Sequence, residues 1–179
     1  MRNNIQDKLN SLHKYNRVLL AFGYCGNSVA GLVTGSFELI LPKVDDCVSL
    51  LLGSFQKRKK IPNDKHSVYL TEGWLNHESN MENEYEYLLK KYGEARARRI
   101  IDAMYAHHDQ LSVIDTGAYN LDSILWRTEK LAEKFRLKHL VVPGTTEYID
   151  KLLLGPWPAN MFITLAPHSE LSSDKLILP

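Results

Sequence analysis

The sequence predicts an α/β protein with largely parallel sheets and helices on both faces. Short apolar runs bounded by glycine or proline alternate with segments of helical periodicity along most of the chain. Such alternation is typical of parallel strands joined by helical crossovers. The run Leu39–Pro42 leads to a helix ending at Gly53, and the run Leu140–Pro143 leads to a helix ending at Gly155. This likeness favours two similar β-α-β-α-β lobes, although α/β proteins also reuse similar pieces without duplication.

The elements of the first lobe, residues 1–80, follow from apolar spacing and from glycine and proline positions. The pattern predicts, in order, a helix over 2–14, a strand over 18–22, a glycine-rich turn and short helix over 23–31, a strand over 37–41, a helix capped by Asp45 and ending at Leu52, and a strand over 67–71. Pro42 ends the second of these strands because it has no backbone N–H to donate.

A helical connector and a second lobe are expected after residue 80. Two apolar faces predict helices between 81 and 108, broken at Gly93, so residues 81–110 form the connector. The second lobe, residues 111–179, is predicted to contain a strand over 111–115, a helix over 121–136, a strand over 140–142, a helix over 147–154 and a strand over 161–166.

Composition excludes several classes of protein. The 179 residues carry a net charge of +1, which disfavours nucleic acid or a membrane surface as a partner. The one basic run, 57–60, is typical of a solvated helix end. The chain has no apolar stretch near the roughly 20 residues that span a bilayer and no secretion signal at its start. Its two cysteines do not form a disulfide framework, so we expect a cytoplasmic protein with reduced thiols.

The candidate site lies where the first three strands end. Ligands of open parallel sheets bind beyond the carboxyl ends of the strands. Those ends present ligand-binding candidates, Gly23, Tyr24, Gly26, Asn27, Asp45, Asp46 and Trp74, and metal-ligand candidates, Cys25, Cys47 and His77. We therefore expect two thiols, several carboxylates and an imidazole at one edge of the sheet.

The two thiols allow more than one interpretation. Thiolates and an imidazole suit a soft metal ion or a cobalt- or iron-bearing cofactor, but three ligands do not complete a structural zinc site. Cys47 falls in the first turn of its helix, where the helix end is expected to lower the pKa of the thiol. A cysteine is also often an inert, buried apolar residue. The second lobe carries Ala118 and Thr145 at the corresponding turns, so the fold itself does not need the sulfur atoms.

The order of several motifs resembles a known family. These motifs are Phe22-Gly23-Tyr24-Cys25-Gly26-Asn27, Leu41-Pro42-Lys43-Val44-Asp45-Asp46-Cys47, Leu51-Leu52-Gly53-Ser54, Thr71-Glu72-Gly73-Trp74, Ile114-Asp115-Thr116-Gly117 and Leu154-Gly155-Pro156-Trp157. They resemble the family catalogued as domain of unknown function 1638, whose members occur largely in anaerobic bacteria and methanogens. Family members often appear beside corrinoid-dependent methyltransferases, which implies a role in one-carbon metabolism and a metal ion or corrinoid as cofactor.

The resemblance also bears on partners. Family members usually begin with a further strand that holds another cysteine, whereas this sequence starts at what resembles the helix after it. The resemblance thus implies an incomplete thiolate set and an unpaired strand edge, which a second copy in a homodimer would cover.

Three functions are consistent with the residues and the resemblance. The first is a metal- or corrinoid-handling accessory protein, with corrinoid-dependent methyltransferase proteins or a small ligand as partners. The second is an enzyme such as a methyl-group transferase, in which Cys47 is the nucleophile or zinc-activated acceptor and Asp45, Asp46 or His77 carries the proton. The third is a non-catalytic module that binds an anion or a protein through the amides of the glycine turn.

Overall fold

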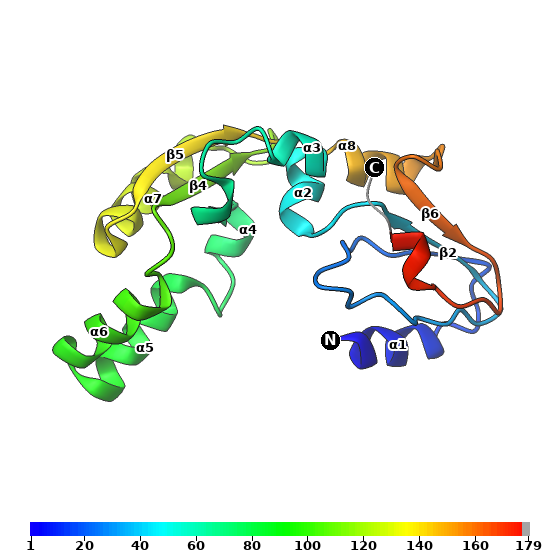
Figure 1. Cartoon of the computed structure of the whole chain (residues 1–179), viewed down its shortest axis with the longest axis horizontal. Coiled ribbons are helices and arrows are strands. Elements are labelled where there is room, and N and C mark those ends of the chain that lie inside the picture. Colours follow the sequence, from blue (N-terminus) through cyan, green and yellow to red (C-terminus); the bar gives the residue numbers. More distant parts are fainter. Residues whose placement is uncertain (177–179) are drawn as a thin grey trace. The chain divides into compact units, whose positions relative to one another are not determined.

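The computed structural model describes residues 1–176, and the chain divides into two compact units. The first unit comprises residues 1–59 and the described residues from 145 onward, and the second comprises residues 60–144. Each unit contains helices packed on a small sheet, which confirms the predicted α/β class (Figure 1).

The first unit contains α1 (Arg2–Asn10), β1 (Arg17–Leu19), β2 (Glu38–Pro42), α2 (Cys47–Leu52), α3 (Phe55–Arg58), α8 (Glu147–Leu154), β6 (Phe162–Leu165) and the 3-10 helix η2 (Ser173–Leu176). Its sheet has the order β1-β2-β6. Strand β1 is parallel to β2, and β6 is antiparallel to β2 with Leu39 opposite Leu165.

Side-chain alternation along β2 gives this sheet two buried faces. Leu39 and Leu41 pack into one apolar cluster together with Leu9 of α1. Ile40 points the other way and packs with Leu152 of α8. Because successive side chains of a strand alternate between faces, the uninterrupted apolar run of β2 is explained by helices or loops covering both sides.

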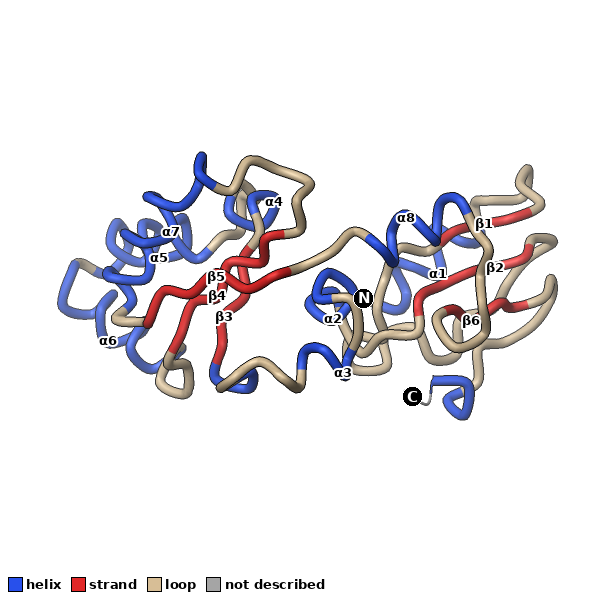
Figure 2. Tube along the Cα trace, turned by 90° about the horizontal axis from the view of Figure 1, so that it is seen from above, coloured by secondary structure: helices blue, strands red, loops and turns tan. Residues whose placement is uncertain are grey.

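The second unit contains the 3-10 helix η1 (Asp64–His66), β3 (Ser67–Leu70), α4 (Glu72–Leu75), α5 (Met81–Tyr92), α6 (Glu94–Met104), β4 (Gln110–Asp115), α7 (Asp122–Phe135) and β5 (Lys138–Pro143). Its strands have the order β3-β4-β5 and all pair in parallel (Figure 2). Leu70, Leu111 and Val113 pack with side chains of the helices, including Tyr85 of α5 and Phe135 of α7.

The opposite face of the second sheet carries buried polar side chains beside apolar ones such as Ile114 and Val142. The Ser67 hydroxyl donates to the Ser112 hydroxyl at 2.7 Å, and the Gln110 side-chain amide donates to the Pro62 carbonyl at 2.9 Å. Buried polar groups on this face are therefore satisfied by neighbouring strands and by the segment that enters β3.

The division into units differs from the expected lobes 1–80 and 111–179 and the connector 81–110. Strand β3 pairs with β4 rather than with β2, and β6 pairs with β2. The helices α5 and α6 are part of the core of the second unit, since Tyr85 and Ile101 are buried in its apolar cluster. The third strand expected in each lobe therefore lies in the sheet of the other. Strand β3 pairs in parallel with β4, and β6 pairs in antiparallel with β2.

Several element boundaries also differ from expectation. The first helix ends at Asn10 and the first strand at Leu19, residues 23–31 form turns instead of a helix, and the predicted loop over 72–80 contains α4. The break at Gly93 is confirmed, with φ of 74° between α5 and α6. Within residues 1–176, no helix combines the length and the apolarity needed to cross a membrane.

Candidate functional site

The segments that follow β1 and β2 run together beyond the ends of the strands. The Tyr24 amide donates to the Val44 carbonyl at 2.9 Å, and the Cys25 amide donates to the Asp45 carbonyl at 2.6 Å. These bonds continue the parallel pairing of β1 with β2 into the loops. The structure therefore brings the segments of Cys25 and Cys47 together at the carboxyl edge of the first sheet.

Gly23 permits this close approach. A Cβ atom built on Gly23 would lie 2.6 Å from the carbonyl carbon and 2.7 Å from the Cα of Asp46. Both atoms belong to the backbone, so no side chain can move aside to make room. Gly23, whose predicted ligand contact stays a prediction, lets the two cysteine-bearing loops touch because it has no side chain.

The turn that carries Cys25 has an unusual backbone. Cys25, Gly26 and Asn27 have φ values of 41°, 66° and 66° in succession. Left-handed conformations are costly for residues with a Cβ, and they cluster at functional sites when the surroundings hold them in place. Here the Ser28 hydroxyl donates to the Cys25 carbonyl at 2.7 Å and helps to close the turn.

Cys47 is the first residue of α2, as the sequence indicates. The helix is capped by Asp46 rather than by Asp45: the Asp46 side chain accepts a hydrogen bond from the Ser49 amide at 2.9 Å. Taken as whole residues, Cys47 is exposed and Cys25 is partly exposed, and neither forms a disulfide. Both residues can thus be reached from solvent.

The pKa of both thiols is raised, contrary to the expectation for Cys47. Burial of the thiol is the main cause at Cys25, where a hydrogen bond from the Cys47 amide acts in the opposite direction and the Asp46 and Asp45 carboxylates raise the pKa further. Burial is again the main cause at Cys47, followed by the charge of Cys25 and that of Asp46. The amides at the start of α2 act to lower the pKa of Cys47, but burial, the Cys25 thiol and the Asp46 carboxylate outweigh them.

Arg58, which belongs to the basic run 57–60, contacts both acidic side chains that precede Cys47. Its guanidinium donates to the Asp46 carboxylate at 2.5 Å and lies 3.5 Å from the Asp45 carboxylate. Its effect is to offset part of the negative charge beside the thiols. No signal in the sequence could have identified this contact, since α3 is only four residues long and carries no clear periodicity.

Asp45 keeps an unsatisfied oxygen near this cluster. Its Oδ1 atom is buried and has no hydrogen-bond partner among the described residues, although the Asp45 Oδ2 atom faces Arg58. A buried carboxylate oxygen without a donor is rare in folded proteins because burial removes its water. This oxygen is available to a cation or a donor that enters the site.

The remaining predicted residues lie elsewhere. Tyr24 is only 5% exposed and belongs to the apolar cluster of the first unit, so it does not line an open edge as expected. Trp74 is half-buried against the core of the second unit. His77 is an exposed residue of the second unit whose Nδ1 accepts a hydrogen bond from the Ser79 amide at 3.1 Å. The expected delivery by three neighbouring strands fails for Trp74 and His77, because β3 belongs to the other sheet.

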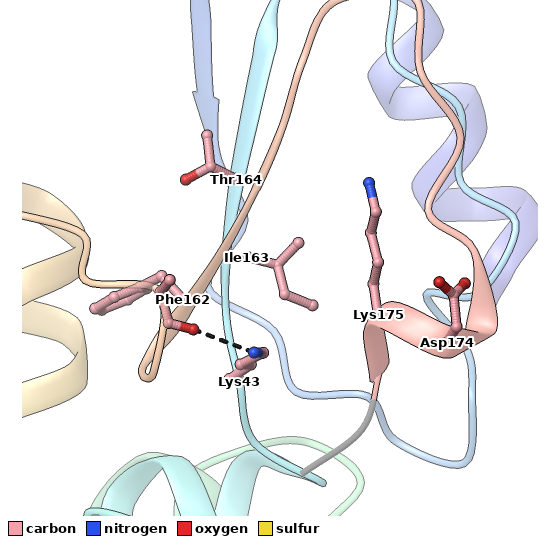
Figure 3. Close-up of a pocket in the computed structure, with 7 residues that line it drawn as sticks. Lys43, Phe162, Ile163, Thr164, Asp174 and Lys175 are labelled. Carbon is pink, nitrogen blue, oxygen red and sulfur yellow. Dashed lines mark hydrogen bonds between the residues drawn. The ribbon is translucent and has the colours of Figure 1, made fainter. Parts of the chain in front are cut away.

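A separate cavity of the first unit has a volume of about 260 Å³ and lies between β6 and η2 (Figure 3). The Lys43 ammonium reaches its wall, where it donates to the Ala159 carbonyl at 3.1 Å. Its lining consists of Lys43, Ala159, Phe162, Ile163, Thr164, Asp174 and Lys175. None of the predicted site residues lines this cavity. It is therefore distinct from the site formed by Cys25, Cys47, Asp45 and Asp46, which we call the thiol site.

The thiol site is chemically incomplete as a metal centre. Within residues 1–176, no group of three or more histidine, cysteine, aspartate or glutamate side chains has the arrangement that holds a metal ion. A pair of thiols can supply two soft ligands, and a bound group would have to bring the others.

Comparison with known proteins gives one finding. No curated protein and no solved structure matches the chain. A family model matches residues 1–153, which include both cysteines, the glycine turn and the acidic loop after β2. The chain therefore belongs to the family described as Protein of unknown function (DUF1638).

Proposed function

We propose that this chain is a metal- or cofactor-handling accessory protein that binds a soft metal centre through Cys25 and Cys47. The observation that carries the proposal is the joining of the two cysteine segments by the backbone bonds from Tyr24 to Val44 and from Cys25 to Asp45. The charge of Cys25 raises the pKa of Cys47, as expected of a neighbouring thiol. Soft thiolate ligands select metals such as copper(I), zinc and iron–sulfur centres.

The charges around the thiols support a cation as the ligand. Two thiols and two carboxylates lie close together, and the Arg58 guanidinium contacts both carboxylates. Deprotonating both thiols there is unfavourable unless a positive charge replaces the protons. The buried Oδ1 of Asp45 is a further group that a nearby cation would stabilise.

The same charges disfavour the other two functions. A free thiolate nucleophile needs a lowered pKa, whereas the pKa of both thiols is raised by burial and by neighbouring negative groups. An anion at the amides of the glycine turn would meet Asp45 and Asp46. We therefore advance neither a thiol-dependent methyl-group transferase nor an anion-binding module.

The incomplete ligand set favours handling over permanent binding. A structural zinc site closes four positions with protein ligands, but the thiol site offers two sulfur atoms. A metal that arrives with ligands of its own, such as the cobalt of a corrinoid, would need only a small number from the protein. Family members often appear beside corrinoid-dependent methyltransferases, and this association supports a corrinoid as that group and a role in one-carbon metabolism.

Anaerobic titration of the reduced protein with Co²⁺ tests metal binding. We expect sulfur-to-cobalt charge-transfer absorbance in the wild type and its loss in both Cys25→Ser and Cys47→Ser. Ser28→Ala is the matched control, because it changes the same turn and keeps both thiols. His77→Ala tests the predicted third ligand. Absorbance that survives either cysteine substitution, or that never appears in the wild type, would refute the thiolate site.

Gel filtration with hydroxocobalamin under reducing, anaerobic conditions tests the corrinoid separately. We expect the corrinoid to elute with the wild type and not with the double variant Cys25→Ser/Cys47→Ser. If Co²⁺ binds and the corrinoid does not, the thiolate site stands and the corrinoid assignment is wrong.

A further inference from the structure

The α5–α6 pair forms a helical hairpin in the second unit. The two helices lie next to each other and are joined at Gly93 (Figures 1 and 2). Leu88 and Ala97 are buried, as are Tyr85 and Ile101, so each helix turns one apolar face into the core. Their other faces remain open within the described residues.

One open face of α6 carries unpaired arginines over an apolar floor. A groove of about 480 Å³ is lined by Arg96, Arg99, Ile100 and Ala103. These positions follow the spacing i, i+3, i+4, i+7 and therefore share a helix face. Arg96 lies over the Tyr92 ring at 5.0 Å, and Arg99 donates weakly to the Ala95 carbonyl at 3.4 Å. Neither guanidinium pairs with a carboxylate among residues 1–176.

The start of α5 offers a pocket of the opposite charge. This pocket of about 280 Å³ is lined by Glu78, Ser79, Asn83, Glu84 and Tyr87. Across residues 1–176 the carboxylates of Glu78 and Glu84 form no ion pair, whereas Glu82 pairs with Arg127 at 2.8 Å. The Tyr87 side chain is 56% exposed.

We propose that two copies of this chain associate through the α5–α6 hairpin, with the arginine groove of one copy receiving the carboxylate pocket of the other. Charge complementarity carries the proposal, because among the described residues Arg96 and Arg99 have no carboxylate partner and Glu78 and Glu84 have no cationic partner. The hairpin also exposes Tyr87, Tyr92 and Met104 at 56%, 38% and 44%. Arginine, tyrosine and methionine are the residues that protein interfaces favour, and buried contacts of this kind contribute most of the binding energy.

Reversing the charge of either surface should weaken the dimer. Arg96→Glu/Arg99→Glu places like charges across every contact of a homodimer, and so does Glu78→Arg/Glu84→Arg. Opposed like charges at an interface are strongly unfavourable. We therefore expect the dimer dissociation constant of each variant alone to be about 100-fold higher than that of the wild type. An equimolar mixture of the two variants restores opposite charges at both contacts, so it should associate again.

Sedimentation velocity of the full chain over a range of concentrations measures these outcomes. Lys8→Glu/Lys14→Glu is the matched control, because it changes the net charge equally but lies in the first unit. Circular dichroism establishes that each variant is folded. The wild type should also dissociate more readily at high salt. A wild type that stays monomeric, variants that still associate alone, or a mixture that stays monomeric would each overturn the proposal; the last outcome would point to a different acidic or basic partner.

Discussion

Replacing Gly23 with alanine tests whether the site depends on the close contact of two loops. The new Cβ would lie 2.6 Å from the carbonyl carbon of Asp46, against an ordinary contact of about 3.5 Å. The loops would therefore have to separate by roughly 1 Å. Such a separation weakens the backbone bonds from Tyr24 to Val44 and from Cys25 to Asp45.

The expected loss of stability follows from these two effects. Overpacking against backbone destabilises by about 1–3 kcal/mol, and two weakened hydrogen bonds add about 1 kcal/mol each. The free energy of unfolding should fall by about 4 kcal/mol, which shifts the urea midpoint by roughly 2 M. Gly26→Ala is the matched control: its Cβ has open space, and only its φ of 66° is unfavourable, at about 1 kcal/mol.

Urea unfolding followed by circular dichroism compares the two variants. In the absence of urea, Gly23→Ala should lower the affinity for Co²⁺ more than Gly26→Ala does, because only the Gly23 substitution separates the two thiols. Equal destabilisation of the two variants, or intact stability in Gly23→Ala, would show that the loops do not touch as described.

Two further predictions concern the core of the first unit. Leu152→Ala should lower the free energy of unfolding by about 2–5 kcal/mol because Leu152 is 1% exposed, whereas Leu154→Ala on the same helix should change it by less than about 0.5 kcal/mol because Leu154 is 84% exposed; similar losses in urea unfolding would contradict the assigned face of α8. Tyr24→Phe should leave stability at neutral pH unchanged or increase it by about 1 kcal/mol, since the buried hydroxyl has no partner within residues 1–176. Burial raises the pKa of Tyr24 to about 12 from 10.0, so the folded state retains the phenol proton more strongly than the unfolded state. Its contribution to stability is complete below pH 10 and is lost as the pH rises toward 12, and the Tyr24→Phe variant should show a smaller alkaline loss in unfolding experiments between these values.

The sequence predicted elements well where the local pattern decides the structure. The helix over 147–154 and the break at Gly93 were recovered because apolar spacing and a glycine with positive φ are local features. The strand over 67–71 was also recovered, but its neighbour was not. Periodicity places Val68 and Leu70 on one face of a strand, and it contains no information on whether β2 or β4 lies beside that face.

The site could be predicted only as far as the pairing of the first two strands. The parallel neighbours β1 and β2 deliver Cys25 and Cys47 to one edge, as the alternation of elements indicates. His77 and Trp74 were assigned to that edge through β3, and they moved to the other unit with it. The predicted direction of the pKa shift at Cys47 was wrong, because a helix end is visible in the sequence, whereas the burial of the thiol, the second thiol and the carboxylate that outweigh it arise only in the folded chain.

Asp45 and Asp46 are adjacent, but the structure gives them different roles. The Asp46 carboxylate uses one oxygen to cap α2 and the other to bind Arg58, so it is already satisfied. The Asp45 carboxylate keeps a buried oxygen without a donor among the described residues. Asp46 therefore fixes the position of Cys47, whereas Asp45 faces Arg58 with one oxygen and leaves the other without a donor. A buried oxygen of this kind is costly unless another group offsets its lost hydration, and a bound cation would do so for this oxygen and for both sulfur atoms together.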